Sequence, residues 1–425
     1  MSDPTTTGLD GVYRAEFGRA VATVARLTGD IGTAEDAVQE AFAAAVRTWR
    51  RDGVPANPGA WITTAARRRA LDGLRRESAR GGKEREALRA TPAPAEPDDP
   101  GLPDDRLRMI FTCCHPALAP PARVALTLRF VCGLRTTEIA RAFLQSEATM
   151  AQRITRAKAK IRQARIPLRV PPAALLPERT PTVLAVIYLM FTEGYFATSG
   201  PRAVRDELCD EAIRVGRLLC DLLPVEEHAV RSEAYALLAL MLLTDSRRST
   251  RRTTGGELVP LDEQDRAAWD RAGIRAGLDC LLIAAEGGGP YLAQARIAAA
   301  HAVAPEWAAT DWRAIVAAYD ELMSYAPSPA VAVNRAIAVG MRDGPERGLA
   351  VLDEIADDHP RAAGHPVAAA RADLFRRAGR PSDAVPEYRA AIAAAGNDAA
   401  RGYLRRRLAE AEGAARTHPS PAAGS

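Results

Sequence analysis

Residues 134–165, LRTTEIARAFLQSEATMAQRITRAKAKIRQAR, decide the fold of this chain, because they predict two helices joined by a short turn. Thr136 can cap the first helix, and Ser146 can open the second after a break at residues 144–146. Apolar residues on the second helix recur in steps of four, three and four, which predicts one buried stripe. This stripe consists of Met150, Ile154, Ala157 and Ile161.

The opposite face of the second helix carries hydroxyl, amide and cationic groups. Its residues are Thr149, Gln152, Arg153, Arg156 and Lys160. Groups of these kinds on a rigid helix can hydrogen-bond to base edges in the major groove of DNA. An ordinary helical hairpin with a solvated basic face would give a similar pattern, but we expect a DNA-binding helix-turn-helix.

The composition predicts an all-α protein of two or three domains, because the 425 residues are 47% hydrophobic, rich in Ala and poor in β-branched runs. The net charge of +4 does not by itself indicate a class of binding partner, but the charged residues are unevenly distributed along the chain. Residues 61–89 hold nine Lys and Arg against four Asp and Glu, and residues 135–169 hold nine against two. Two basic segments in an otherwise acidic chain indicate two separate contacts with a polyanion.

Several classes of site are not expected. The six cysteines show no CxxC spacing, and the adjacent pair in Cys113-Cys114-His115 is poorly arranged to bind one ion, so we expect buried thiols and no metal. A phosphate loop or a nucleophile–base series is also lacking, so we expect neither a cofactor nor an enzyme. The sequence shows no signal peptide or transmembrane run, which favours a cytoplasmic protein without a membrane contact.

Three amphipathic helices are predicted before the basic hairpin, at residues 12–27, 33–49 and 60–80. The second places Val46 and Trp49 on its apolar side and Asp36, Gln39 and Glu40 on its outer side. The third has an apolar stripe of Ile62, Ala66, Ala70 and Leu74. Polar residues on the other side of the third helix, and in the loop before it, are Asn57, Arg67, Arg68, Asp72, Arg75 and Arg76.

Three segments in series resemble the extracytoplasmic-function (ECF) sigma factors of the sigma-70 family. They are DAVQEAF (36–42), PGAWITTAARRRALDGLRRE (58–77) and LRTTEIARAFLQSEATMAQRITRAKAKIR (134–162). Arg68 is a departure, because the family usually has Asn at this position. The resemblance implies promoter DNA and core RNA polymerase as partners, with contacts to the β′ clamp and the β flap.

The resemblance also implies a role for each polar face. Polymerase binding falls to Asp36, Gln39 and Glu40, and −10 DNA binding to Asn57, Arg67, Arg68, Asp72, Arg75 and Arg76. The −35 element is then read by Thr149, Gln152, Arg153, Arg156 and Lys160. The expected domains are sigma region 2 at residues 10–80, a flexible linker at 81–103, sigma region 4 at 104–170, a connector at 171–181 and a helical extension at 182–415.

The extension contains a weak repeat of about 35 residues, close to the tetratricopeptide (TPR) period. Residues 330–360 and 366–395 each predict helix, Gly turn, helix, so that Gly344 matches Gly379 and Leu352 matches Tyr388. A subgroup of ECF sigma factors shares CCHPAL (113–118) and LDEQDRAAWD (261–270) and carries a TPR-like extension. Arrays of such repeats present a concave surface to a partner protein, and the resemblance implies that the extension controls activity. The extension could inhibit the sigma domains or support them, and of these two alternatives we favour support.

Two other functions are compatible with parts of the sequence. A stand-alone helix-turn-helix regulator with a TPR-like sensing domain would explain residues 134–165 but would leave residues 36–76 without a role. A scaffold protein would have basic segments that are only solvated faces. A sigma factor accounts for all three segments, and the sequence therefore predicts one.

Overall fold

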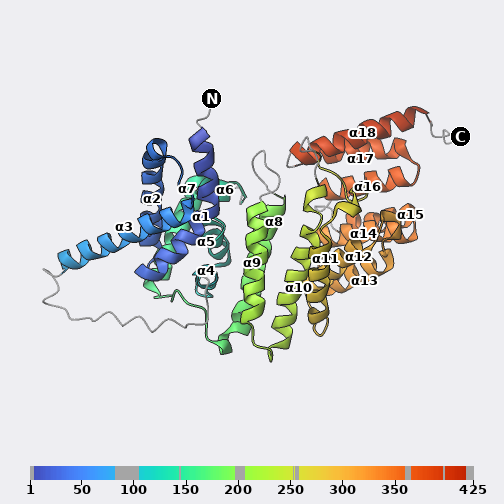
Figure 1. The fold of residues 1–425 in the computed structure, drawn as a ribbon. Helices are drawn as coiled ribbons and strands as arrows, with labels where there is room; N and C mark the ends of the chain where they lie inside the picture. Colours follow the sequence, from blue (N-terminus) through green and yellow to red (C-terminus); the bar gives the residue numbers. More distant parts are fainter. Residues whose placement is uncertain are drawn as a thin grey trace. The chain divides into compact units, whose positions relative to one another are not determined.

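The computed structural model describes residues 4–81, 105–142, 145–196, 206–251, 253, 258–358, 365–395 and 398–417 (Figure 1). The regular elements of these residues are α-helices and short 3-10 helices, as predicted for an all-α chain. The chain forms two compact units, Met1–Pro224 and Val225–Ser425. The predicted linker at 81–103 lies almost wholly outside the described residues.

The helices of the first unit are α1 (Pro4–Thr28), α2 (Ile31–Asp52), α3 (Pro58–Gly81), α4 (Asp105–Cys113), α5 (Pro120–Phe130), α6 (Thr136–Ala142), α7 (Glu147–Gln163), α8 (Leu176–Phe196) and α9 (Asp206–Leu222). The helices of the second unit are α10 (His228–Asp245), α11 (Arg271–Ala284), α12 (Pro290–Val303), α13 (Trp312–Tyr325), α14 (Pro329–Asp343), α15 (Pro345–Asp358), α16 (His365–Arg377), α17 (Pro381–Ala394) and α18 (Asp398–Thr417). Short 3-10 helices lie at Ala173–Leu175, Arg248–Thr250, Arg266–Ala268 and Trp307–Ala309.

Helices α1, α2 and α3 pack against one another as a small bundle around fully buried side chains such as Phe17, Val38 and Ile62. Asp30 is the N-cap of α2. Its carboxylate accepts a hydrogen bond of 2.7 Å from the backbone N–H of Thr33. Val46 is 39% exposed, so its predicted place on the apolar side is wrong. Val46 lies at the edge of the apolar stripe of α2, and the buried residues of the helix form the centre of that stripe.

Helices α4 to α7 form the second part of this unit, and α6 with α7 is the predicted helix-turn-helix. Ser146 caps α7 by accepting a hydrogen bond of 3.2 Å from Thr149 N–H. The buried side chains of α7 are the four predicted from the sequence, Met150, Ile154, Ala157 and Ile161. Thr136 is the first residue of α6, not its cap, and Glu138 accepts a hydrogen bond from the N–H of Arg135 instead.

The first unit ends with the antiparallel hairpin of α8 and α9 (Figure 1). Helix α8 begins at Leu176, so the predicted connector at 171–181 is wrong from that residue on, and Pro181 lies inside the helix. Residues Ala173–Tyr195 are long and apolar enough to cross a membrane by length and composition alone. In the structure α8 packs on α9, with Val183, Ile187 and Met190 buried, as a core helix does.

The second unit is a series of helix pairs packed in sequence order (Figure 1). The predicted repeat is present as α14–α15 and α16–α17, and the matched residues Leu352 and Tyr388 are both buried. Gly344 and Gly379 end the first helix of each pair with φ of +103° and +70°, a conformation that favours glycine. The repeat pattern therefore reflects two helical hairpins of the same kind.

Candidate polymerase and nucleic-acid interface

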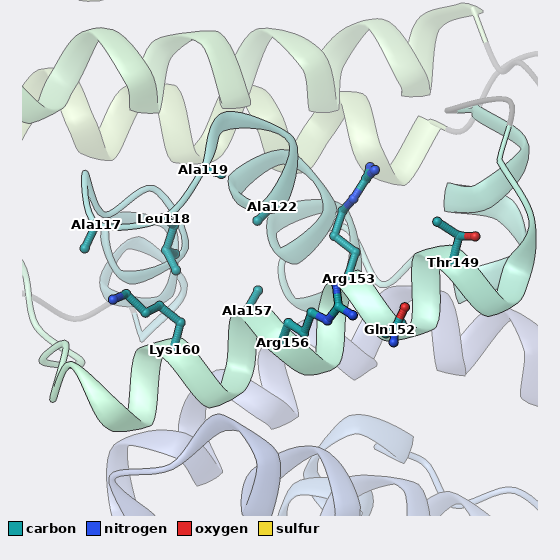
Figure 2. A pocket seen from close by; sticks show the side chains of 10 residues that line it. All are labelled: Ala117, Leu118, Ala119, Ala122, Thr149, Gln152, Arg153, Arg156, Ala157 and Lys160. Atoms are coloured by element: carbon teal, nitrogen blue, oxygen red, sulfur yellow. The ribbon is translucent and has the colours of Figure 1, made fainter.

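The outer face of α7 is held in place by its buried stripe and is open to solvent. Thr149, Gln152, Arg156 and Lys160 are exposed, and Arg153 is half-buried. Figure 2 shows these side chains along one side of α7, facing the turn that precedes α5 and the start of that helix. Between the two elements lies a groove of about 300 Å³, lined also by Ala117, Leu118, Ala119, Ala122 and Ala157.

This groove has the composition of a nucleic-acid surface. Its floor is made of small apolar groups, and its edge carries the amide of Gln152 and three cationic side chains from α7. Cations provide attraction to phosphates, while guanidinium and amide groups can pair with base edges. The structure therefore brings the predicted −35 residues together on one accessible face.

The predicted −10 residues lie along α3 and the loop before it. Arg67, Arg68, Arg75 and Arg76 are exposed, and so is Asp72. Asp72 lies 3.5 Å from Arg75, and its backbone carbonyl accepts a hydrogen bond from Arg76. These arginines form a basic face, partly neutralised by one carboxylate, that suits a DNA strand.

Asn57 has a structural task besides the one predicted. Its side-chain oxygen accepts a hydrogen bond of 3.0 Å from the N–H of Ala60, which caps the start of α3. The residue as a whole is exposed. Nearby, Trp61 packs edge-on against the buried Trp49 at 5.5 Å between ring centroids, so both rings serve the core of the bundle.

The predicted polymerase-binding residues on α2 are exposed. Asp36, Gln39 and Glu40 all lie on the solvent side of the helix. Gln39 donates a hydrogen bond of 3.2 Å to Glu35, and Glu40 lies 3.6 Å from Arg69 on α3. A rigid helix with small polar and acidic groups at this spacing offers a docking face for a partner helix.

Glu35, beside these residues, is a functional candidate that the sequence reasoning missed. Its side chain is buried, with 5% of the residue exposed, and it contacts Arg129 of α5 and Lys158 of α7. The spacing of the sequence does indicate that Glu35 is buried. It lies three residues before Val38 and seven before Phe42, which places its carboxylate on the apolar face of α2. A buried carboxylate requires a cationic partner, but the sequence does not name that partner.

The CCHPAL segment has a structural role in the described residues. Burial raises the pKa of Cys114 to about 12 and that of Cys113 well above its ordinary value, because both thiols lie in the apolar interior. His115 accepts a hydrogen bond from the N–H of Ala117, and Arg123 donates to the carbonyl of Leu118. These contacts shape the turn that forms one wall of the groove beside α7. Within the described part of the chain no cluster of three His, Cys, Asp or Glu is placed to hold a metal ion.

The first helices of the extension are joined to region 4 by polar contacts. Arg106 of α4, which is 6% exposed, forms an ion pair with Glu211 of α9. Arg179 of α8 donates a hydrogen bond of 2.6 Å to the carbonyl of Phe111. The extension therefore begins as part of the same compact unit as the helix-turn-helix.

In the second unit the segment LDEQDRAAWD joins the helix pairs to one another. Asp262 pairs with Arg377 of α16 at 3.1 Å, and Glu263 pairs with the buried Arg407 of α18 at 2.5 Å. Arg266 donates to the carbonyls of His301 and Ala304. This segment thus links the two ends of the unit.

Comparison with known protein families identifies three segments of the chain. Residues 12–80 match the family Sigma-70 region 2, and residues 108–161 match Sigma-70, region 4. Residues 179–285 match a Family of unknown function (DUF6596). This last match begins in α8 and ends just after α11, so it spans the boundary between the two compact units.

Individual relatives cover different parts of the chain. An uncharacterised protein of Rhizobium meliloti is 39% identical over 92% of this chain and 92% of its own length. The ECF RNA polymerase sigma factor SigK of Mycobacterium tuberculosis is 30% identical over 36% of this chain and 87% of its own length. The probable ECF RNA polymerase sigma factor SigI of the same species is 30% identical over 39% of this chain and 58% of its own length. With both sigma regions matched in order and an ECF sigma factor covered over most of its length, the chain belongs to the ECF sigma factors of the sigma-70 family and carries a helical C-terminal extension.

Proposed function

We propose that this sigma factor binds the β′ clamp of core RNA polymerase through the outer face of α2 and the β flap through region 4. The basic face of α3, with the Asn57 loop, then holds the −10 element, and the outer face of α7 reads the −35 element. One observation carries the proposal. Three polar faces, on three helices in the predicted order, are exposed while the opposite side of each helix is buried.

The chemistry required of the protein is recognition and positioning, since bond formation belongs to the polymerase. The acidic and amide groups of α2 suit a protein surface, whereas the cations of α3 and α7 suit the two DNA elements. A protein that binds core polymerase and promoter DNA must lie in the same compartment as both, and we infer that this chain acts in the cytoplasm.

Run-off transcription tests the proposal. Core polymerase and the full-length protein would first be used to select promoters from a random DNA pool, and the selected DNA would then be transcribed. We expect a discrete transcript only when polymerase and sigma factor are both present. A tight footprint of the protein alone on the selected DNA, with no effect of polymerase, would favour a stand-alone regulator and defeat the proposal.

We further propose that the C-terminal extension supports this activity. The ion pair of Arg106 with Glu211, and the hydrogen bond from Arg179 to region 4, tie the hairpin α8–α9 to the helix-turn-helix module. Packing of this kind lowers the entropy cost of holding region 4 in one conformation. The extension would thus brace region 4 directly, and its second unit would offer helix-pair surfaces to a protein partner.

Two truncated forms separate these roles in a transcription assay with matched amounts of protein. A chain ending after Arg169 loses the α8–α9 hairpin, and we expect it to lose most transcription. A chain ending after Pro224 keeps the hairpin and lacks only the second unit, so its activity shows what the second unit contributes. Lower activity of this form supports a co-activating extension, higher activity indicates autoinhibition, and equal activity leaves the second unit without a regulatory role.

A further inference from the structure

The second unit contains a small cavity where α10, α12 and the segment before α11 meet. Helices α10 and α12 pack against each other in this unit (Figure 1). The cavity has a volume of about 20 Å³, and its wall includes Arg247, Trp269 and His301. Thr244 adds a hydroxyl group, and the rest of the wall is aliphatic. A cavity of this size holds one water-sized group, so a ligand can place only one polar atom inside it.

Arg247 brings a positive charge to the wall of the cavity. The residue is half-buried and lies just after the end of α10. With the described residues its guanidinium makes no hydrogen bond, ion pair or ring contact. Two carboxylates near it in the fold have other partners, because Asp245 pairs with Arg248 at 2.7 Å and Asp270 caps α11. The guanidinium of Arg247 is therefore available to a ligand.

Arg266 is a second cation beside the cavity, and only 6% of the residue is exposed. Its Nη1 atom donates hydrogen bonds of 2.6 Å and 3.0 Å to the carbonyls of His301 and Ala304 at the end of α12. The guanidinium also lies 4.9 Å from the centre of the Trp269 ring. Its Nη2 atom is buried and has no hydrogen-bond partner among the described residues. A buried guanidinium usually has a carboxylate partner, and in the described part of the chain Arg266 has none.

His301 supplies a neutral donor to the same wall. Its Nδ1 atom is buried and, like Nη2 of Arg266, has no hydrogen-bond partner within the described residues. Burial and the charges of Arg247 and Arg266 lower the pKa of His301 to about 4. The imidazole is therefore neutral near pH 7, and one of its ring nitrogens carries a proton that it can donate. The rings of Trp307 and Trp312 pack against it, with centroids 6.0 Å and 5.4 Å away.

The positive charge of this place exceeds what the surrounding protein compensates. Arg247 and Arg266 each carry one positive charge. The C-terminal ends of α10 and α12 lie here, and each supplies a partial charge of about −0.5. About one positive charge is then left over, beside buried nitrogen atoms of Arg266 and His301 that lack partners. A ligand with a negative charge would satisfy both the charge and the nitrogen atoms.

We propose that this cavity is a binding site for a small oxyanion, which places one oxygen of a carboxylate or phosphate group against Arg247, His301 and Thr244. Both groups accept charge-assisted hydrogen bonds from a guanidinium, so they share the required chemistry. A water molecule fits the same volume but leaves the excess positive charge in place. The remainder of the ligand extends past the half-buried Arg247 towards solvent. The site does not depend on the sigma function proposed above.

Binding at this site would stabilise the second unit. Arg266 and Trp269 belong to the segment whose Asp262 and Glu263 pair with α16 and α18. His301 belongs to α12, so a ligand in the cavity contacts two elements that are distant in the sequence. Because these elements come together only in the folded chain, the ligand binds the folded form and raises its stability. The extension thereby becomes sensitive to the concentration of a small acidic molecule.

Nuclear magnetic resonance of the histidine side chains in the full-length protein tests the site. The chain has six histidines, and the signal that is missing from His301→Gln identifies His301. Sodium phosphate and sodium acetate are added separately at pH 7, with the ionic strength held constant by sodium chloride. We expect at least one of these oxyanions to shift the His301 signal until it saturates. A bound anion also raises the pKa of His301 towards its ordinary value, because it opposes the charges of the two arginines.

Arg247→Gln tests the cation of the wall without removing a contact of the fold. We expect this variant to bind the oxyanion at least about tenfold more weakly, which is the loss of one charge-assisted hydrogen bond. Arg405→Gln is the matched control, because Arg405 is an exposed residue of α18 outside the cavity and its replacement removes the same charge. It should bind as the unsubstituted protein does.

Ala298→Val tests the cavity while every charge stays in place. Ala298 lies in the wall, and the added methyl groups occupy the space that the oxygen atom needs. We expect binding in this variant to be weakened by at least about tenfold as well. Circular dichroism and thermal unfolding of each variant verify that the second unit is folded.

The site is refuted by any of three results. Phosphate and acetate shift the His301 signal no more than chloride does at the same ionic strength, Arg247→Gln binds as tightly as Arg405→Gln, or Ala298→Val leaves binding unchanged. Tighter binding of phosphate than of acetate, or the reverse, assigns the site to one of the two groups. The measurement needs neither polymerase nor DNA, so its outcome is separate from that of the transcription assay.

Discussion

Replacing Arg156 by Ala should weaken −35 recognition without disturbing the fold. The side chain is exposed on the open face of α7, while Met150, Ile154 and Ala157 fix the helix from behind. Within the described residues no hydrogen bond or ion pair engages its guanidinium, so none is lost when it binds DNA. A bidentate contact to a guanine is worth about 1–3 kcal/mol, which is a loss of roughly 5-fold to 150-fold in affinity.

Lys160 on the same face allows base contacts to be distinguished from phosphate contacts. If the three cations of the face each neutralise one phosphate, the slope of log affinity against log salt is about −2.7 from this helix. Lys160→Ala should make that slope shallower by about 0.9 and weaken all sequences alike. Arg156→Ala should in addition reduce the preference for the correct base.

The assay is fluorescence anisotropy of a −35 duplex with the polymerase-bound protein, at several salt concentrations and with single-base variants of the duplex. Arg162→Ala is the matched control, because Arg162 is an exposed cation of α7 that lies outside the groove. An Arg156→Ala variant that keeps the original affinity and base preference would refute the assignment of α7 as the reading helix. An equal effect of Arg162→Ala would show that only the overall charge matters.

Three other outcomes are expected. Replacing Asp36 and Gln39 together by Ala should weaken core-polymerase binding in a pull-down while helical circular dichroism is unchanged, because both side chains point to solvent. Burial beside two arginines lowers the pKa of His301 to about 4, so only the unfolded chain takes up this proton below about pH 6.5. Stability should then fall by about 2 kcal/mol between pH 7 and pH 5 in urea unfolding, and His301→Gln should remove that part of the pH dependence. Arg407→Met should lower the free energy of unfolding of the second unit by about 1–2 kcal/mol in thermal unfolding, because it removes a buried partner of Glu263, whose own carboxylate is part-exposed.

The parts of the fold that follow from local periodicity could be predicted from the sequence. The stripe on α7 and its Ser146 cap are set by residues three to four positions apart, and the structure contains both. The Gly turns at Gly344 and Gly379 are equally local, because each requires a backbone conformation that glycine adopts without strain. Exposure of the three predicted polar faces follows from the same periodicity.

The contacts between distant segments could not be predicted in this way. Glu35 is 94 residues from Arg129 and 123 from Lys158, and no spacing rule joins them. The start of α8 was also missed, because Pro181 indicates a break although proline is tolerated near the beginning of a helix. Long-range partners depend on how modules dock, and docking is specified by surfaces that periodicity only partly describes.

Two arginines are buried among the described residues of region 4, and each pairs with a carboxylate from a different neighbouring element. Arg106 pairs with Glu211 of the α9 hairpin, and Arg129 pairs with Glu35 of region 2. Because a buried guanidinium without its partner is costly, region 4 cannot lose both neighbours and keep these two side chains where they are. The contact of Arg106 with the hairpin therefore contributes to the stability of this helical module even where Arg129 has lost its own partner. We therefore expect a chain cut after Arg169 to unfold its helix-turn-helix part at a lower temperature than a chain cut after Pro224, because only the shorter form leaves Arg106 without its carboxylate partner.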